Sequence, residues 1–264
     1  DLGVKISDVS FDFLSIAMAV TAVDSFYLRE ESPNNWARIF NIELPLKNPI
    51  LWNDVKADLE RALGFLTGDQ WNFNFIVGGL DAPSPKSHTR SEIVKNTITQ
   101  LQKLNCVSLF SGGVDSTIGA IDMLNGSKQN NSPLLVSHAY RGDGKRQDKI
   151  KKALIKGKSY HWTLNANPRS IQGRDNDTTM RSRSFNFIAM AVIGLSALQN
   201  LSPKKKINKV FIPENGYIAL NPPLTRRRIG SLSTRTTHPY FLSTIEEILQ
   251  GVGLDVEIIN PYAV

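Results

Sequence analysis

The chain has 264 residues and a net charge of +7, from 31 basic and 24 acidic side chains, and 41% of its residues are hydrophobic. This length suits one large domain or two modest ones with a substantial core. The basic balance favours an anionic ligand, either a nucleotide or a nucleic acid.

A single cysteine excludes a disulfide framework, and no signal peptide is visible. The longest apolar run, 13–23, is too short to cross a bilayer and is interrupted by Ser15 and Thr21. We therefore expect a soluble, cytoplasmic protein that does not insert into a membrane.

Residues 1–90 predict a small α+β domain followed by a linker. Apolar periodicity predicts four elements: a helix over 12–29, a strand over 36–44 that Pro45 ends, a helix over 52–66 and a strand over 71–77. Gly68 and Asp69 predict a turn, and residues 78–90 are typical of a linker. No catalytic constellation is visible here, so we expect this unit to dock a partner or to shape an active-site cleft.

The most informative segment follows a short apolar run, 106–110, that is typical of a buried parallel strand. It reads Ser111-Gly112-Gly113-Val114-Asp115-Ser116-Thr117 and leads into an amphipathic helix. Glycines let the backbone pass close to a ligand, and a helix N-terminus attracts anions. The hydroxyl groups add hydrogen bonds, and the carboxylate suits Mg²⁺. The segment predicts a phosphate-binding loop; a glycine turn without a ligand is the alternative.

This loop is neither a Walker A loop nor a dinucleotide fingerprint. It resembles the pyrophosphate loop of the PP-loop ATP pyrophosphatases, α/β enzymes that cleave ATP to AMP and pyrophosphate. The resemblance implies a Rossmann-like parallel sheet of the adenine nucleotide alpha-hydrolase (HUP) type over 91–264. It also implies that ATP and Mg²⁺ are bound by 111–117, with Asp115 holding the metal and Asp115 and Ser116 taking part in catalysis.

A long apolar helix is predicted to begin near 178 and to carry Arg181 and Arg183 in its first turn. Arginines at this end oppose the helix dipole unless an anion lies in front of them. The segment resembles the family's Gly-Arg-Asn helix start, which implies that Arg183 neutralises ATP phosphate as a catalytic and nucleotide-binding residue. The alternative is that both arginines lie on the surface.

Strands and helices alternate through the rest of the chain. Strands are predicted over 133–138, 160–164, 209–213 and 256–260, and helices over 147–155 and 242–249. His138, Glu214 and Asn215 each end or follow a predicted strand, where open α/β sheets bind ligands. We assign them to substrate binding, with a structural histidine as the alternative for His138. Gln147 matches only part of a Tyr-Gly-Gln element that the resemblance places near the nucleotide.

The loop over 214–239 carries hydroxyl groups, an arginine and a histidine between glycines. Arg235, Thr237 and His238 therefore predict a second anion pocket that binds substrate. A plain surface loop is the alternative, although loops of this length are usually functional. Lysines at 204–206 suit either a solvated loop or nucleic-acid contact.

Within the superfamily, the chain resembles the 7-cyano-7-deazaguanine synthase (QueC-like) branch. It is most similar to the QueC-like proteins of Qat anti-phage systems and the related enzymes of type IV CBASS. The resemblance implies that a 7-carboxy-7-deazaguanine-type substrate is adenylated, and that the 7-deazapurine is supplied or attached to a partner protein in bacterial defence. Zinc is not expected, because the synthases' C-terminal cysteine cluster is missing from this chain, which has Cys106 alone.

Two alternatives remain open at this point. A PP-loop enzyme that modifies tRNA would suit the basic balance, although thiolation is disfavoured because the one thiol is predicted to be buried. A scaffold that senses nucleotide without turnover would bind ATP and produce no AMP.

Overall fold

The computed structural model describes residues 4–85, 92–125, 131–139, 143–154, 159–165, 168, 177, 181–216 and 235–263. Its central feature is a five-stranded parallel sheet in the order β5-β4-β3-β6-β7. The strands are β3 (Cys106–Leu109), β4 (Pro133–His138), β5 (Tyr160–Leu164), β6 (Lys209–Phe211) and β7 (Glu257–Ile259). Numbered within this sheet, the order is 3-2-1-4-5, which is the doubly wound arrangement of Rossmann-like folds. The predicted α/β class with a parallel sheet is confirmed.

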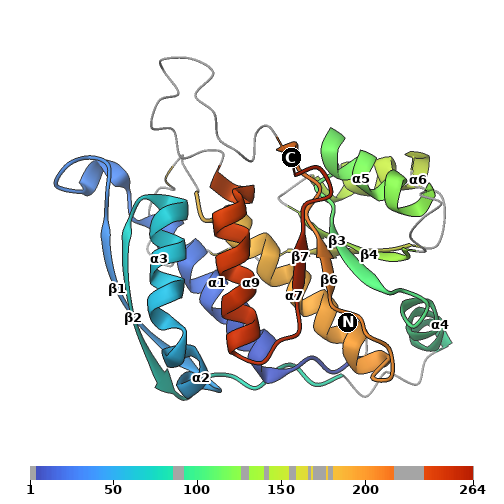
Figure 1. Cartoon of the computed structure of the whole chain (residues 1–264), viewed down its shortest axis with the longest axis horizontal. Coiled ribbons are helices and arrows are strands. Elements are labelled where there is room, and N and C mark those ends of the chain that lie inside the picture. Colours follow the sequence, from blue (N-terminus) through green and yellow to red (C-terminus); the bar gives the residue numbers. More distant parts are fainter. Residues whose placement is uncertain are drawn as a thin grey trace.

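Helices cover both faces of this sheet (Figure 1). On one face lie α5 (Val114–Asn125) and α6 (Asp143–Leu154), and on the other lie α7 (Arg183–Leu201) and α9 (Pro239–Gly251). The helix α4 (Glu92–Leu101) leads into β3. All six residues of β4 are buried, because a parallel strand covered on both faces needs a continuous apolar run.

The first part of the chain forms a second, two-stranded parallel sheet. Its elements are α1 (Asp8–Phe26), a 3₁₀ turn (Arg29–Glu31), β1 (Ile39–Leu46), α2 (Pro49–Asp54), α3 (Lys56–Thr67) and β2 (Gln70–Val77). Two predictions are wrong here. β1 continues through Pro45, which an edge strand tolerates because the missing N–H need not interrupt the ladder. The predicted helix over 52–66 is two helices that meet at Val55, and the first begins at Pro49.

The two parts share one hydrophobic core. α7 is buried on nearly all sides, and α1 packs directly against it. The ring of Phe13 in α1 lies edge-on to Phe185 in α7, with centroids 5.3 Å apart, and stacks on Trp52 of α2 at 5.8 Å. One continuous cluster of buried apolar side chains includes all three. The predicted boundary between 1–90 and 91–264 therefore runs through a shared core.

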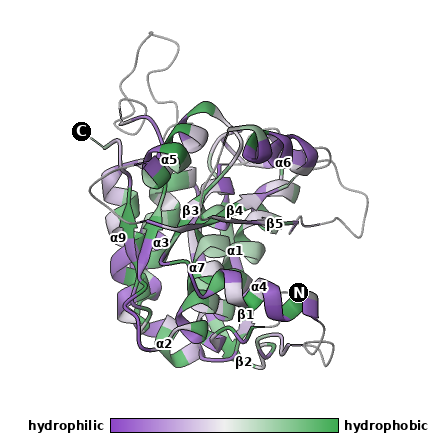
Figure 2. Cartoon of the chain, turned by 90° about the vertical axis from the view of Figure 1, so that its right-hand side faces the viewer, coloured by the Kyte–Doolittle hydropathy of each residue, from purple (hydrophilic) through white to green (hydrophobic). Residues whose placement is uncertain are grey.

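Among the described residues, α1 and α7 are long and apolar enough to cross a membrane by length and composition alone. Half of the most apolar stretch of α1 and 72% of that of α7 are buried inside the protein, as in the core helices of a soluble protein. Figure 2 shows the hydrophilic colouring concentrated on outer helices, above all on α6.

Candidate functional site

The loop between β3 and α5 has a backbone that only glycine adopts easily. Gly112 has φ = 74°, in the left-handed region that side chains disfavour. A Cβ atom at this position would lie 3.2 Å from Cγ of Gln147. α5 begins at Val114, so Asp115, Ser116 and Thr117 lie in its first turn, whereas the sequence predicted them to lie in the loop before the helix.

Three hydrogen bonds close a ring within the loop. The hydroxyl of Ser116 donates to the carbonyl of Gly113 at 3.2 Å, and the N–H of Gly113 donates to Ser111 Oγ at 3.2 Å. The two serine hydroxyl oxygens lie 3.0 Å apart, and since Ser116 gives its proton to Gly113, Ser111 is the donor between them. Thr117 also donates to the carbonyl of Gly113, at 2.7 Å. The loop is therefore shaped before any ligand arrives.

A pocket of about 190 Å³ opens beside this loop. It lies at the carboxyl ends of β3, β4 and β6. In doubly wound folds the ligand crevice lies where the connections of neighbouring strands diverge, here between β3 and β6. Residues of the predicted site line it together: Ser111, Gly113, Ser116, His138, Arg183 and Glu214. They come from four separate stretches of sequence, and the fold brings them to one place.

Further lining residues were not singled out by the sequence. Asp143 and Arg146 enter from α6, and Phe187 and Met190 enter from α7. The His138 ring lies 5.4 Å from the Phe187 ring, and the guanidinium of Arg183 lies 5.2 Å from the same ring. The predicted helix start at 147 hid Asp143 and Arg146, because α6 begins four residues earlier.

Gln147 joins the loop to the neighbouring strand. Its side-chain amide donates to the carbonyls of Ser111, at 3.3 Å, and His138, at 3.2 Å. Its Oε1 atom is buried and accepts no hydrogen bond within the described part of the chain. A buried amide oxygen without a donor is uncommon, and Gln147 is one of the residues that line the pocket.

The carboxyl group of Glu214 has a raised pKa, because it is buried and because Asp115 adds a nearby negative charge. A divalent cation beside Asp115 would relieve both effects, so these two residues fit a Mg²⁺ ion. Asn215 follows Glu214 along the chain, and Val114 is largely exposed on the outer side of α5. Among the described residues, no three His, Cys, Asp or Glu side chains gather as a metal-binding group.

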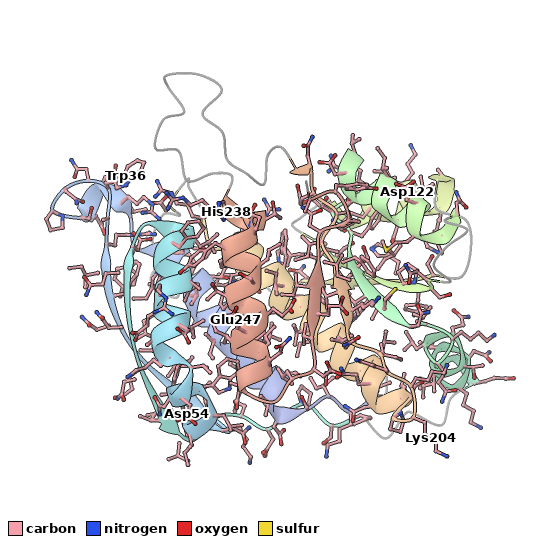
Figure 3. All side chains as sticks on the ribbon, viewed as in Figure 1. Trp36, Asp54, Asp122, Lys204, His238 and Glu247 are labelled. Atoms are coloured by element: carbon pink, nitrogen blue, oxygen red, sulfur yellow. The ribbon has the colours of Figure 1, made fainter. Side chains whose placement is uncertain are left out.

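The second predicted anion pocket is not assembled at this place. Arg235 and Thr237 form a 3₁₀ turn, and His238 caps α9, at the end marked in Figure 3. The Arg235 guanidinium donates to the carbonyl of Phe65 in α3 at 2.8 Å and lies 4.7 Å from its ring. His238 accepts from the N–H of Tyr240 and meets the same Phe65 ring. These contacts join α9 to α3. Residues 226–228 lie outside the described residues.

A buried ion network holds the start of α7, where Arg183 lies. Asp24 accepts from the N–H of Ser182 at 2.8 Å, which places a negative charge at the helix N-terminus. Asp24 also pairs with Arg38, which in turn pairs with Asp69. Burial by itself would raise the pKa of the Asp69 carboxyl, but hydrogen bonds from Arg38 and Arg29 outweigh it and hold that pKa below its usual range.

Arg181 belongs to this network and not to the pocket. Its guanidinium donates to the carbonyl of Thr67 at 2.8 Å and lies 4.4 Å from the ring of Trp36. The resemblance assigned the phosphate-binding role to Arg183 alone, and the two arginines do lie in different places. Only Arg183 lines the pocket.

Comparisons with known protein families, characterised proteins and solved structures find no match to this chain. Function is therefore inferred from the site itself. The one thiol, Cys106, is buried within β3, and burial raises its pKa to about 12. A thiol with so little thiolate at neutral pH is a poor nucleophile, which disfavours sulfur transfer.

Proposed function

We propose that the chain binds ATP in this pocket and cleaves it between the α- and β-phosphorus atoms to adenylate a carboxylate. The observation that carries the proposal is the convergence of loop, helix N-terminus, Arg183 and Glu214 at the switch point of a doubly wound sheet. The resemblance of 111–117 to a pyrophosphate loop supports the same assignment.

Each residue has a role that its position allows. The N–H groups at the start of α5 donate to the β- and γ-phosphates, and the hydroxyls of Ser111 and Ser116 hold the loop in the shape that presents them. Arg183 lies across the pocket and neutralises phosphate charge as pyrophosphate leaves. Asp115, with Glu214, would hold Mg²⁺, which supplies charge neutralisation for the phosphates when bound.

In the proposed reaction a carboxylate oxygen attacks the α-phosphorus, and the bond from that phosphorus to the bridging oxygen breaks. The products are an acyl-adenylate and pyrophosphate. An amine then displaces AMP and forms an amide, or a nitrile after dehydration with a second ATP. The residues of the pocket contribute alignment and charge stabilisation.

The family resemblance extends this proposal to a 7-deazaguanine carboxylate as substrate. It also extends it to a cytoplasmic role in anti-phage defence, with the deazapurine attached to a partner protein. Mass spectrometry of a partner protein co-expressed with this chain tests that extension. The expected result is an added deazapurine mass at the partner's terminus, and an unmodified partner would contradict it.

Phosphorus NMR of ATP and Mg²⁺ incubated with the protein and a carboxylate substrate tests the core reaction. We expect AMP and pyrophosphate to appear. ADP with phosphate would contradict the proposal, and ATP that binds but stays intact would favour a nucleotide-sensing scaffold.

Asp115→Ala is expected to lower turnover by about 10²–10³-fold, the usual effect of removing one electrostatic contact to a transition state. Asp122→Ala is the matched control, because Asp122 lies on the same helix and accepts a hydrogen bond from the hydroxyl of Tyr262 at 2.7 Å. Circular dichroism should show both variants folded. Pyrophosphate release by Asp115→Ala at the wild-type rate would refute the assigned role.

A further inference from the structure

Beneath the loop, on the far side of β4 from the pocket, three polar side chains form a chain of hydrogen bonds. His161 on β5 lies with Nε2 2.7 Å from Ser137 Oγ on β4. Its Nδ1 lies 2.9 Å from a carboxylate oxygen of Asp148 on α6. The Ser137 hydroxyl also contacts the carbonyl oxygen of Phe110, the last residue before the loop.

This serine, histidine and aspartate have the spacing of a nucleophilic triad but not its access. Ser137 is 1% exposed, and its hydroxyl is enclosed between β3 and β5. A nucleophile must reach a substrate, so the arrangement does not serve covalent catalysis. The chain of hydrogen bonds ends at the carbonyl of Phe110, which is joined directly to the first residue of the loop.

With a proton on Nδ1 that is donated to Asp148, the hydrogen count allows two arrangements. Asp148 and the Phe110 carbonyl only accept, and Ser137 has one proton to donate. With neutral His161, Nδ1–H donates to Asp148 and Nε2 takes the Ser137 proton, so Phe110 loses that donor. With charged His161, Nε2–H donates to Ser137 and Ser137 donates to Phe110. Every group then has a partner.

We propose that His161 and Asp148, acting through Ser137, are positioning residues that set the peptide bond between Phe110 and Ser111. A trans peptide holds its C=O and N–H in opposite directions, so fixing the Phe110 carbonyl also fixes the Ser111 N–H that opens the loop. The protonated relay holds this peptide, and the neutral relay releases it. Its value for catalysis rests on the proposed function, whereas its coupling to the loop does not.

The surroundings decide the direction of the response. Asp148 is 57% exposed and His161 only 6% exposed. Burial lowers the pKa of His161, Asp148 raises it in part, and Lys151 on α6 lowers it further. The other contacts of His161 within the described part of the chain are with uncharged groups, the Phe110 ring at 5.4 Å and the Thr163 hydroxyl at 3.4 Å. The charged arrangement therefore gains population only as the pH falls below the usual histidine range.

Nitrogen-15 NMR of the unliganded protein tests the coupling directly. The chain has four histidines, and His161→Gln assigns the signal. We expect neutral His161 to carry its proton on Nδ1, and the backbone amide signal of Ser111 to shift with the same pH midpoint as His161. In His161→Gln the Ser111 amide signal should stay constant over that range. A neutral Nε2–H form, a His161 signal that does not titrate while the protein stays folded, or a Ser111 signal that ignores His161 would each overturn the proposal.

Pyrophosphate binding links the relay to the site. Pyrophosphate itself gains protons as the pH falls, and dividing the affinity of the wild-type protein by that of His161→Gln removes this effect. The ratio should rise about three- to tenfold as His161 becomes charged, which corresponds to one hydrogen bond. Asp148→Asn, at an exposed carboxylate, keeps the fold and should shift the His161 midpoint downward. Lys149→Gln, at the next residue of α6, should change neither the fold nor the His161 midpoint. A ratio that does not vary with pH would overturn the link, and wild-type protein that binds no pyrophosphate would instead contradict the proposed function.

Discussion

Single residues of the loop act through the backbone more than through their charges. The ring of hydrogen bonds among Ser111, Gly113 and Ser116 uses both hydroxyls and one N–H to hold the turn. Gln147 adds a brace from α6 to the carbonyl of Ser111. A phosphate group that enters therefore meets N–H groups at the start of α5 whose positions this ring has already fixed, and little ordering remains to oppose binding.

Gly112→Ala is expected to weaken pyrophosphate binding strongly. Alanine at φ = 74° costs roughly 1–2 kcal/mol, and its Cβ would also press on Cγ of Gln147 at 3.2 Å. Gly253→Ala is a matched control: its φ is 83°, but no atom lies within 4 Å of the added Cβ. Urea denaturation and pyrophosphate titration of both variants separate the two effects.

Both variants should lose a similar amount of stability from backbone strain, because both place alanine in the left-handed region. Only Gly112→Ala should lose affinity for pyrophosphate, and it should be the less stable of the two. Equal affinity in the two variants would show that the close approach to Gln147 does not matter for the loop.

At the scale of helices and strands, periodicity predicted what local sequence determines. The five strands of the large sheet and the loop after β3 were found because each is a short apolar run bounded by polar turns. The sequence did not show that the helix breaks at Val55 or that β1 continues through Pro45. Both features depend on tertiary packing, which sets how each helix packs and leaves one edge of β1 unpaired. The contact between Arg235 and Phe65 could not be read from the sequence for the same reason, since the two residues lie 170 positions apart.

The start of α7 shows how one element positions another. Asp24 in α1 receives the N–H of Ser182 and pairs with Arg38, so the first part of the chain holds the helix that carries Arg183. Neither role can be read from the sequence, where Asp24 is a lone acid within an apolar helix. The N-terminal unit thus contributes to the pocket without lining it.

Asp24→Asn is expected to destabilise the protein by about 3–5 kcal/mol, because it leaves Asp69 as the one carboxylate paired with two buried arginines, Arg29 and Arg38. Asp58→Asn is the control, since Asp58 pairs with Arg61 on the surface, where such pairs are worth about 0–1 kcal/mol. Urea denaturation measures both. If Asp24→Asn costs no more than Asp58→Asn, the network does not hold the start of α7 as described.

At the scale of the whole molecule, the two sheets are joined through helices and not through a linker. α1 packs on α7, and α3 packs on α9, so each part covers apolar surface of the other. Figure 1 shows these four helices between the two sheets. A core shared in this way favours unfolding in a single cooperative step.

Hydrogen exchange measured by mass spectrometry in increasing urea follows both parts within one protein. Amides of α3 and of β4 are expected to lose protection at the same urea concentration. Phe13→Ala should lower the free energy of unfolding by about 3–5 kcal/mol for α3 and for β4 alike, because Phe13 packs on Phe185 as well as on Trp52. Ile50→Ala, at a side chain 77% exposed, should change that free energy by no more than about 0.5 kcal/mol in either element. If α3 loses protection first while β4 keeps it, the N-terminal unit is a separable domain. Its contacts with the start of α7, where Arg183 lies, would then form an interface between domains that can open without unfolding the pocket.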